Sequence, residues 1–174
     1  VKGPITEKMC GKSRPGHFKG VTTVVLKLFF IAQPDHAYFG QKDAQQAIVV
    51  RKMVSDLNIP VKIITCPIVR EKDGLALSSR NTYLSQEERA QALALPRALS
   101  AGRDMIIKGE TDPQKVRLHI KQILESSPGI RVDYVEVVDG NDLSDLSVIK
   151  GKVLLAAAVY VGKTRLIDNI DLEV

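Results

Sequence analysis

The sequence predicts an α/β protein in which part of a parallel-sheet domain is followed by a small α+β domain. In the first half, helix-like and strand-like segments alternate, which is typical of a parallel α/β sheet. After residue 67 the alternation ends, and two long helical stretches precede a group of apolar, strand-like runs. We place the domain boundary in the polar loop after Pro67, which gives domains of residues 1–76 and 77–174.

In the first domain, two helices are expected to alternate with two strands. Apolar residues at helical spacing from Val21 to Phe29 predict a helix that Pro34 ends. Residues 37–39 and 61–66 are apolar runs that predict strands. A second helix lies between them, from Asp43 to Asn58. Its expected inward-facing residues are Ala47, Ile48, Val54 and Leu57.

The second domain has clear helix starts and three strand-like segments. Ser85 and Glu88 form a capping box for a long helix, which Pro96 must kink or split. Asp112 and Pro113 begin another helix, since proline is favoured at the first helical position. The predicted strands cover residues 131–138, 153–161 and 165–167. The residues predicted to be core are Ile63 and Ile64 in the first domain and the run from Leu154 to Ala158 in the second.

Composition favours a cytoplasmic enzyme. The chain has 174 residues, of which 44% are hydrophobic and 26% are charged, and no apolar run approaches the roughly 20 residues of a membrane helix. The net charge of +5 suits an anionic ligand, whereas scattered basic residues and only 5% aromatics argue against nucleic acid as the partner. Cys10 and Cys66 lack metal-binding or disulfide spacing, so both are expected to be plain thiols.

One candidate site lies where the first strand is followed by a helix. Ligands of open α/β sheets bind at the carboxyl ends of the strands, and Gly40 occupies such an end. A glycine lets the backbone approach a phosphate, the helix N-terminus favours anions, and Lys42 adds a positive charge. Gln46 lies on the same helical face as Asp43 and can hydrogen-bond a second ligand. A turn glycine beside solvated charges is the alternative interpretation.

A second candidate lies in the loop after Gly74, which offers hydroxyls, amides and a guanidinium from Ser78 to Asn81. Such groups can bind a triphosphate whose charge redistributes during transfer. An ordinary polar linker would have a similar composition. The loop from Ser13 to Phe18 contains Arg14 and His17, and it could equally be a surface turn.

Four motifs in order resemble those of the pantothenate synthetase family. They are residues 10–21 (CGKSRPGHFKGV), 38–43 (YFGQKD), 73–81 (DGLALSSRN) and 165–169 (RLIDN). Because they span nearly the whole chain in the family's order, a chance match is improbable. The resemblance therefore outweighs the alternative interpretation of each motif taken alone.

The resemblance implies a Rossmann-like nucleotidyltransferase domain and a small C-terminal domain that closes over the site. The implied ligase joins pantoate to β-alanine with ATP, through pantoyl adenylate, and releases AMP and pyrophosphate. No covalent enzyme intermediate is required, so positioning and charge stabilisation would supply the catalysis. Mg²⁺ would accompany the triphosphate, held largely by phosphate oxygens and water. The family also implies a homodimer.

Matching the motifs residue by residue implies a role for each position. Lys42 and Arg80 are the catalytic candidates, because each would stabilise phosphate charge, and Gln46 would bind pantoate. The implied ATP contacts are Gly40, Gln41, Lys42, Asp43, Val69, Leu77, Ser78, Ser79 and Arg80. The resemblance leaves Arg14 and His17 without a role.

Two parts of the family pattern have no counterpart here: a His-x-x-His ATP motif near the N-terminus and a glutamine that binds pantoate. We therefore expect a C-terminal portion of the ligase, with about two parallel strands, an open sheet edge and no activity by itself. Two other functions fit the same motifs: a nucleotide-binding module without catalysis, and another adenylate-forming nucleotidyltransferase.

Overall fold

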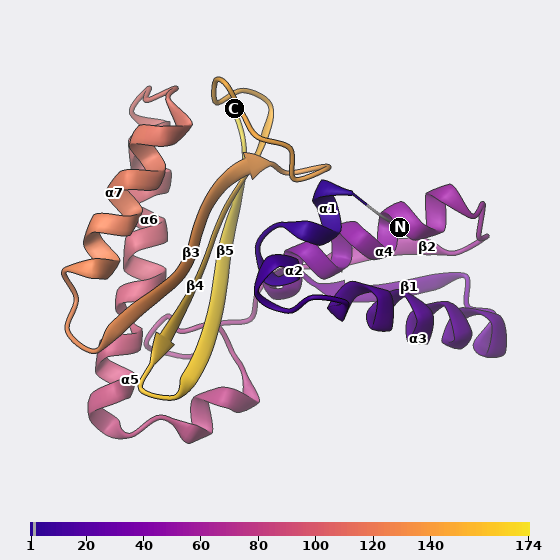
Figure 1. Cartoon of the computed structure of the whole chain (residues 1–174), viewed down its shortest axis with the longest axis horizontal. Helices are drawn as coiled ribbons and strands as arrows, with labels where there is room; N and C mark the ends of the chain where they lie inside the picture. The colour runs from indigo at the N-terminus through magenta and orange to yellow at the C-terminus, as the bar shows by residue number, and fades with distance from the viewer. Residues whose placement is uncertain (2) are drawn as a thin grey trace. The chain divides into compact units, whose positions relative to one another are not determined.

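The computed structural model describes residue 1 and residues 3–174, with residue 4 described in its backbone only. The chain forms two compact units, Val1–Pro67 and Ile68–Val174. Figure 1 labels the helices and strands of both units. Within the described residues, no helix is both long enough and apolar enough to cross a membrane.

The first unit is a strand–helix–strand unit with a parallel sheet, as the sequence predicts. Its elements are α1 (Pro4–Glu7), α2 (Cys10–Ser13), α3 (His17–Ala32), β1 (His36–Gly40), the 3-10 helix η1 (Gln41–Asp43), α4 (Ala44–Asp56) and β2 (Lys62–Cys66). β1 and β2 pair in parallel, from His36 opposite Lys62 to Gly40 opposite Cys66. The two strands therefore end side by side at Gly40 and Cys66.

Side chains from α3, α4 and the residue just before β2 form the core of this unit. Phe29, Val50, Met53 and Val61 are buried together. Leu57 is exposed rather than inward-facing, because α4 ends at Asp56 and the helical periodicity ends with it. Ile63 and Ile64 are only half-buried, since the described sheet has two strands and β2 pairs on one side.

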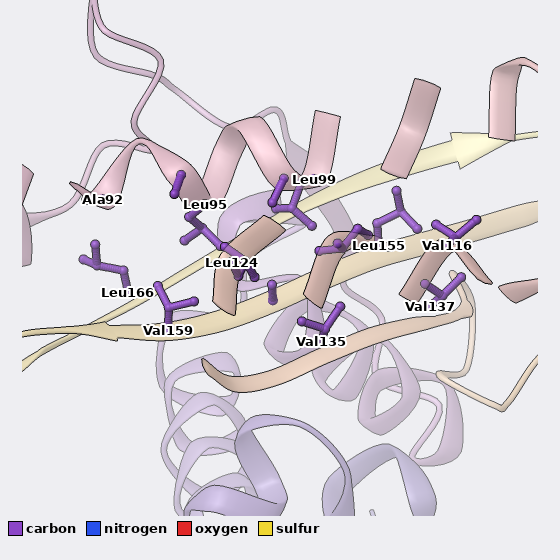
Figure 2. Packing of buried hydrophobic residues seen from close by; sticks show 14 of the residues in the cluster. Ala92, Leu95, Leu99, Val116, Leu124, Val135, Val137, Leu155, Val159 and Leu166 are labelled. Atoms are coloured by element: carbon purple, nitrogen blue, oxygen red, sulfur yellow. The ribbon is translucent and has the colours of Figure 1, made fainter. Parts of the chain in front are cut away.

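The second unit is an antiparallel sheet with helices on one face. Its elements are η2 (Ser79–Tyr83), α5 (Gln86–Ala92), α6 (Ala94–Ile107), α7 (Pro113–Glu125), β3 (Ile130–Asp139), β4 (Lys152–Val161) and β5 (Thr164–Glu173). The strand order is β3-β4-β5, with both pairings antiparallel. α6 and α7 pack on this sheet, and Figure 2 shows the shared apolar cluster that includes Leu99, Leu124 and Leu155. The predicted α/β fold class is confirmed.

Local signals in this unit predict the helix starts correctly and the last strand poorly. The Ser85 hydroxyl accepts from the Glu88 amide at 3.1 Å, and the Glu88 carboxylate accepts from the Ser85 amide at 2.9 Å. The long helix is split at Leu93, so Pro96 falls in the first turn of α6, where a missing N–H costs little. β5 covers ten residues instead of the predicted three, because it pairs with β4 along its whole length.

The boundary between the units falls after Pro67, nine residues before the end of the predicted first domain (residues 1–76). Residues 68–76 belong to the second unit for two physical reasons. Leu75 is buried in the apolar cluster of that unit, and the Arg70 guanidinium pairs with Asp168 on β5. Neither long-range contact can be predicted from the local sequence, because the partners are far away along the chain.

α6 and α7 approach each other closely at Gly102. A Cβ added there would lie 2.5 Å from Cδ1 of the fully buried Ile120. Gly102→Ala is therefore expected to lower the free energy of unfolding by about 1–3 kcal/mol, measured by chemical denaturation. Gly20 on α3 has no atom within 4 Å of such a Cβ, so Gly20→Ala should leave stability unchanged or raise it. Equal effects of the two substitutions would contradict the predicted close packing.

Candidate functional site

The first group of candidate residues lies at the carboxyl end of β1. Gly40 has extended backbone angles (φ −74°, ψ 135°), and a Cβ placed on it would meet nothing within 4 Å. The space above this glycine is open, so a ligand can approach the backbone closely. Gln41 and Lys42 are half-buried in the 3-10 turn, and Asp43 is exposed just before α4. The net positive charge of the chain lies in this unit. Residues 1–67 contain ten Lys and Arg and four Asp and Glu, whereas residues 68–174 contain fifteen Lys and Arg and sixteen Asp and Glu.

Two adjacent glutamines at the start of α4 have different environments. Gln45 is buried, accepts a hydrogen bond from the Cys10 amide at 3.0 Å, and donates to the carbonyls of Ile5 (3.1 Å) and Lys8 (2.9 Å). Gln45 therefore ties the segment around α1 and α2 to α4. Gln46 is half-buried, and its side chain forms no hydrogen bond among the described residues, so the side-chain amide is available to a ligand.

The loop around Arg14 connects α2 with α3. Arg14 is exposed, His17 is the half-buried first residue of α3, and Gly16 before it has a φ of +77° that favours glycine. The surface-turn interpretation describes this geometry adequately. Cys10 and Cys66 are free thiols.

The second group of candidate residues extends from a β-hairpin rather than a simple polar linker. The Leu77 amide donates to the Val69 carbonyl at 2.9 Å, and the Glu71 amide donates to the Leu75 carbonyl at 2.8 Å. Gly74, with a φ of +94°, makes the turn. Val69 and Leu77 are 65% and 55% exposed. They lie opposite each other on neighbouring arms and form a small exposed apolar surface.

The hairpin continues directly into η2, which contains the remaining candidates. The Ser78 hydroxyl accepts from the Arg80 amide at 3.2 Å and so caps η2. Ser79 and Arg80 are exposed. Asn81 is buried, and its side-chain amide donates to the Ala76 carbonyl at 3.0 Å and to the Glu71 carboxylate at 2.6 Å. The Asn81 side-chain oxygen is buried and has no hydrogen-bond donor among the described residues.

A charged cluster holds the turn of the hairpin. The Arg89 guanidinium on α5 lies 2.7 Å from the carboxylates of both Glu71 and Asp73. The hydrogen bond from Asn81, followed by that from Arg89, holds the pKa of Glu71 below its ordinary value. The hydrogen bond from Arg89 likewise lowers the pKa of Asp73, and the two carboxylates raise the pKa of Arg89. The hairpin is therefore fastened to α5 at neutral pH.

These pKa directions predict an acid-sensitive contribution to stability. Because the folded-state pKa values of Glu71 and Asp73 are lowered, their contribution is present above the unfolded-state values of about 4 and is lost as the pH falls through the folded-state values. Arg89→Ala should therefore reduce Tm at about pH 7 and have less effect at about pH 3, as measured by calorimetry. Arg117→Ala on α7 is the control. A loss of Tm that is equal at both pH values would contradict the prediction.

The structure thus resolves the predicted site into two groups, each defined within its own unit. Gly40 to Asp43 and Gln46 surround the end of β1, whereas Val69 and residues 77–80 share one hairpin and the turn after it. Within the described residues, no cluster of three or more His, Cys, Asp and Glu is arranged to hold a metal ion.

Sequence reasoning missed several supporting residues. They are Gln45, Arg70, Glu71, Arg89 and Asp168. Asp168 lies in the motif at residues 165–169, to which the sequence assigns no role. Its partner is 98 positions away, and no local pattern predicts that pairing.

The chain is a two-unit α/β protein, in which a parallel strand–helix–strand unit is followed by an antiparallel α+β unit. Polar residues follow a strand end of the first unit, which is where ligands bind in open α/β sheets. The family model described as "Pantoate-beta-alanine ligase" matches residues 1–171. The chain belongs to the pantoate-β-alanine ligase family.

Individual relatives agree with this assignment. The chain is 60% identical over 174 residues to the pantothenate synthetase of Syntrophomonas wolfei, and it covers 62% of that protein. It resembles the crystal structure of pantothenate synthetase from Thermus thermophilus with a TM-score of 0.93 and 45% identity, covering 98% of this chain and 61% of that one. A Francisella tularensis pantoate-β-alanine ligase, crystallised with β-γ ATP and β-alanine, has a TM-score of 0.68 and 34% identity, covering 98% of this chain and 56% of that one. The chain therefore spans about three fifths of the length of these relatives.

Proposed function

We propose that the protein joins pantoate to β-alanine at the expense of ATP, through pantoyl adenylate, with release of AMP and pyrophosphate. The observation that carries this proposal is the family match over residues 1–171. The Francisella relative was crystallised with an ATP compound and β-alanine, which supports the same small-molecule substrates for this protein.

Two groups of residues are proposed as nucleotide contacts, namely Gly40 to Asp43, and Val69 with residues 77–80. Open space above Gly40 suits a close phosphate contact, and the positive charge of residues 1–67 suits a polyanion. The exposed pair of Val69 and Leu77 offers an apolar surface for the flat face of a base. Ser78 and Ser79 contribute hydroxyls beside it.

When the pantoate carboxylate attacks the α-phosphorus, the bond to the bridging oxygen breaks and negative charge accumulates on the leaving pyrophosphate. Lys42 and Arg80 are proposed to stabilise that charge. Fixed cations at such positions lower the barrier because they need no reorganisation during the reaction. Gln46 is proposed to hydrogen-bond pantoate. The Gln46 side chain has no hydrogen-bond partner among the described residues, whereas the Gln45 side chain makes three hydrogen bonds.

Mg²⁺ is proposed to enter with ATP. Magnesium is usually held by phosphate oxygens and water together with few protein ligands, so it requires no dedicated cluster of carboxylates.

We further propose a cytoplasmic homodimer without a nucleic-acid partner. Exposed apolar residues on α3, namely Val24, Leu28 and Ile31, supply surface that an oligomer would cover. Light scattering after size exclusion measures the oligomeric state.

The reaction is tested by incubating the protein with ATP, pantoate and β-alanine and measuring AMP, pyrophosphate and pantothenate. Two lengths are compared: the 174-residue polypeptide and a version that reaches the length of its relatives. Equimolar AMP and pantothenate from the longer version support the proposal. Nucleotide binding without AMP in that version would indicate a non-catalytic module, and AMP release that needs a different acid would indicate another adenylate-forming enzyme.

A further inference from the structure

A buried carboxylate on β5 holds the hairpin that leads to the proposed nucleotide-contacting residues. Asp168 is only 2% exposed. Its two oxygens accept hydrogen bonds from the two terminal nitrogens of Arg70, at 2.8 and 3.0 Å. One of these oxygens also accepts a hydrogen bond from the backbone amide of Asn169 at 2.8 Å. This is the paired, two-bond geometry that gives an arginine–carboxylate contact its directional specificity.

Arg70 is well placed to fix the hairpin. It lies opposite Ala76 across the two arms, and its guanidinium also donates to the Gly74 carbonyl at 3.1 Å. One side chain therefore contacts the turn of the hairpin and β5 at once. Because side chains alternate along a strand, Val69 and Leu77 point to the opposite face. The exposed apolar pair and the ion pair that Arg70 makes with the buried Asp168 lie on the two faces of the same hairpin.

The energetics favour positioning over stability as the role of this pair. The Asp168 carboxylate is buried, and the desolvation of that charge offsets much of its attraction to Arg70. Removing one partner, however, leaves a buried charge uncompensated, so other placements of the hairpin are disfavoured. The pair thereby restricts residues 69–80 to one arrangement on the sheet.

We propose that Arg70 and Asp168 are positioning residues for the nucleotide, which hold the hairpin so that Val69, Leu77 and Arg80 meet ATP in one fixed geometry. This inference rests on the proposed function. It also assigns a role to the motif at residues 165–169. Neither residue touches the substrate; both act through the hairpin.

The second unit contains a matched ion pair for comparison. Arg165, also on β5, lies 2.7 Å from Asp133 on β3, and both side chains are mostly buried. This pair joins β5 to β3, whereas the Arg70–Asp168 pair joins β5 to the hairpin. A lysine in place of either arginine keeps the charge but loses the planar two-bond contact. Arg70→Lys and Arg165→Lys are therefore chemically equal changes with different expected consequences.

The experiment compares both lysine variants with the unaltered protein, and all three are made in the version that reaches the length of the relatives. Arg70→Lys is expected to raise KM for ATP by between about tenfold and a hundredfold, with KM for β-alanine unchanged, as for a displaced binding group. It should also speed hydrogen exchange at the Leu77 amide, which closes the hairpin. Arg165→Lys should leave KM for ATP and the Leu77 exchange rate unchanged.

The outcomes separate this inference from the proposed function. If the unaltered protein forms no AMP with pantoate, the proposed function fails, while the exchange rates still test whether Arg70 holds the hairpin. If the protein is active and the two lysine variants match in KM for ATP, the positioning role is overturned. A loss of Tm in both variants without a difference in KM would likewise leave Arg70 a purely structural residue.

Discussion

Lys42→Ala is expected to reduce pantoate-dependent pyrophosphate release by about 10²–10³-fold in the protein at the length of its relatives, as for removal of a preorganised charge donor. Lys42 stands two residues after the carboxyl end of β1, in the turn that leads into α4. A cation there would oppose the charge that develops on the phosphates, and alanine provides no substitute. Pyrophosphate release is the informative measurement because it reports adenylate formation separately from the attack by β-alanine.

Lys62→Ala is the matched control for this prediction. Lys62 is exposed in the same unit, but it lies at the amino end of β2, opposite His36. Both substitutions remove one positive charge from the first unit. If Lys62→Ala slowed pyrophosphate release as much as Lys42→Ala, the effect would come from net charge. Unchanged release in the Lys42 variant would remove Lys42 from the mechanism.

Leu155→Ala is expected to lower the free energy of unfolding of the second unit by about 2–5 kcal/mol, because it leaves a cavity in a packed core. Leu155 is fully buried on β4, the central strand, between Val137 and Ile170 on its neighbours. Its side chain lies in the cluster between the sheet and α6 and α7 (Figure 2). The measurement is chemical denaturation followed by circular dichroism.

The matched control is Leu118→Ala on α7, in the same unit. Leu118 is 53% exposed, so its truncation removes little buried surface and should change stability by a few tenths of a kcal/mol. A small effect at Leu155 would mean that the sheet and helices are packed loosely. A large effect at Leu118 would mean that this face of α7 is covered in the protein as it exists in solution.

Local pattern was sufficient for most of the helices and for the class of the fold. The Ser85–Glu88 capping box and the Asp112–Pro113 start depend only on neighbouring residues, and both are present in the structure. The alternation of apolar segments before Pro67 predicted the parallel pairing of β1 and β2 for the same reason. The ordered motifs predicted the family, which the match over residues 1–171 confirms.

Tertiary contacts decided the rest. Leu57 has the right periodicity for the core but follows the end of α4, and β5 is extended by its partner strand rather than by its own composition. The sequence prediction placed residues 68–76 in the first domain, yet pairing with Asp168 and burial of Leu75 make this segment a hairpin of the second unit. Such contacts join residues up to 98 positions apart. A sequence pattern records spacing along the chain, whereas the free energy of burial and ion pairing depends on distances in space.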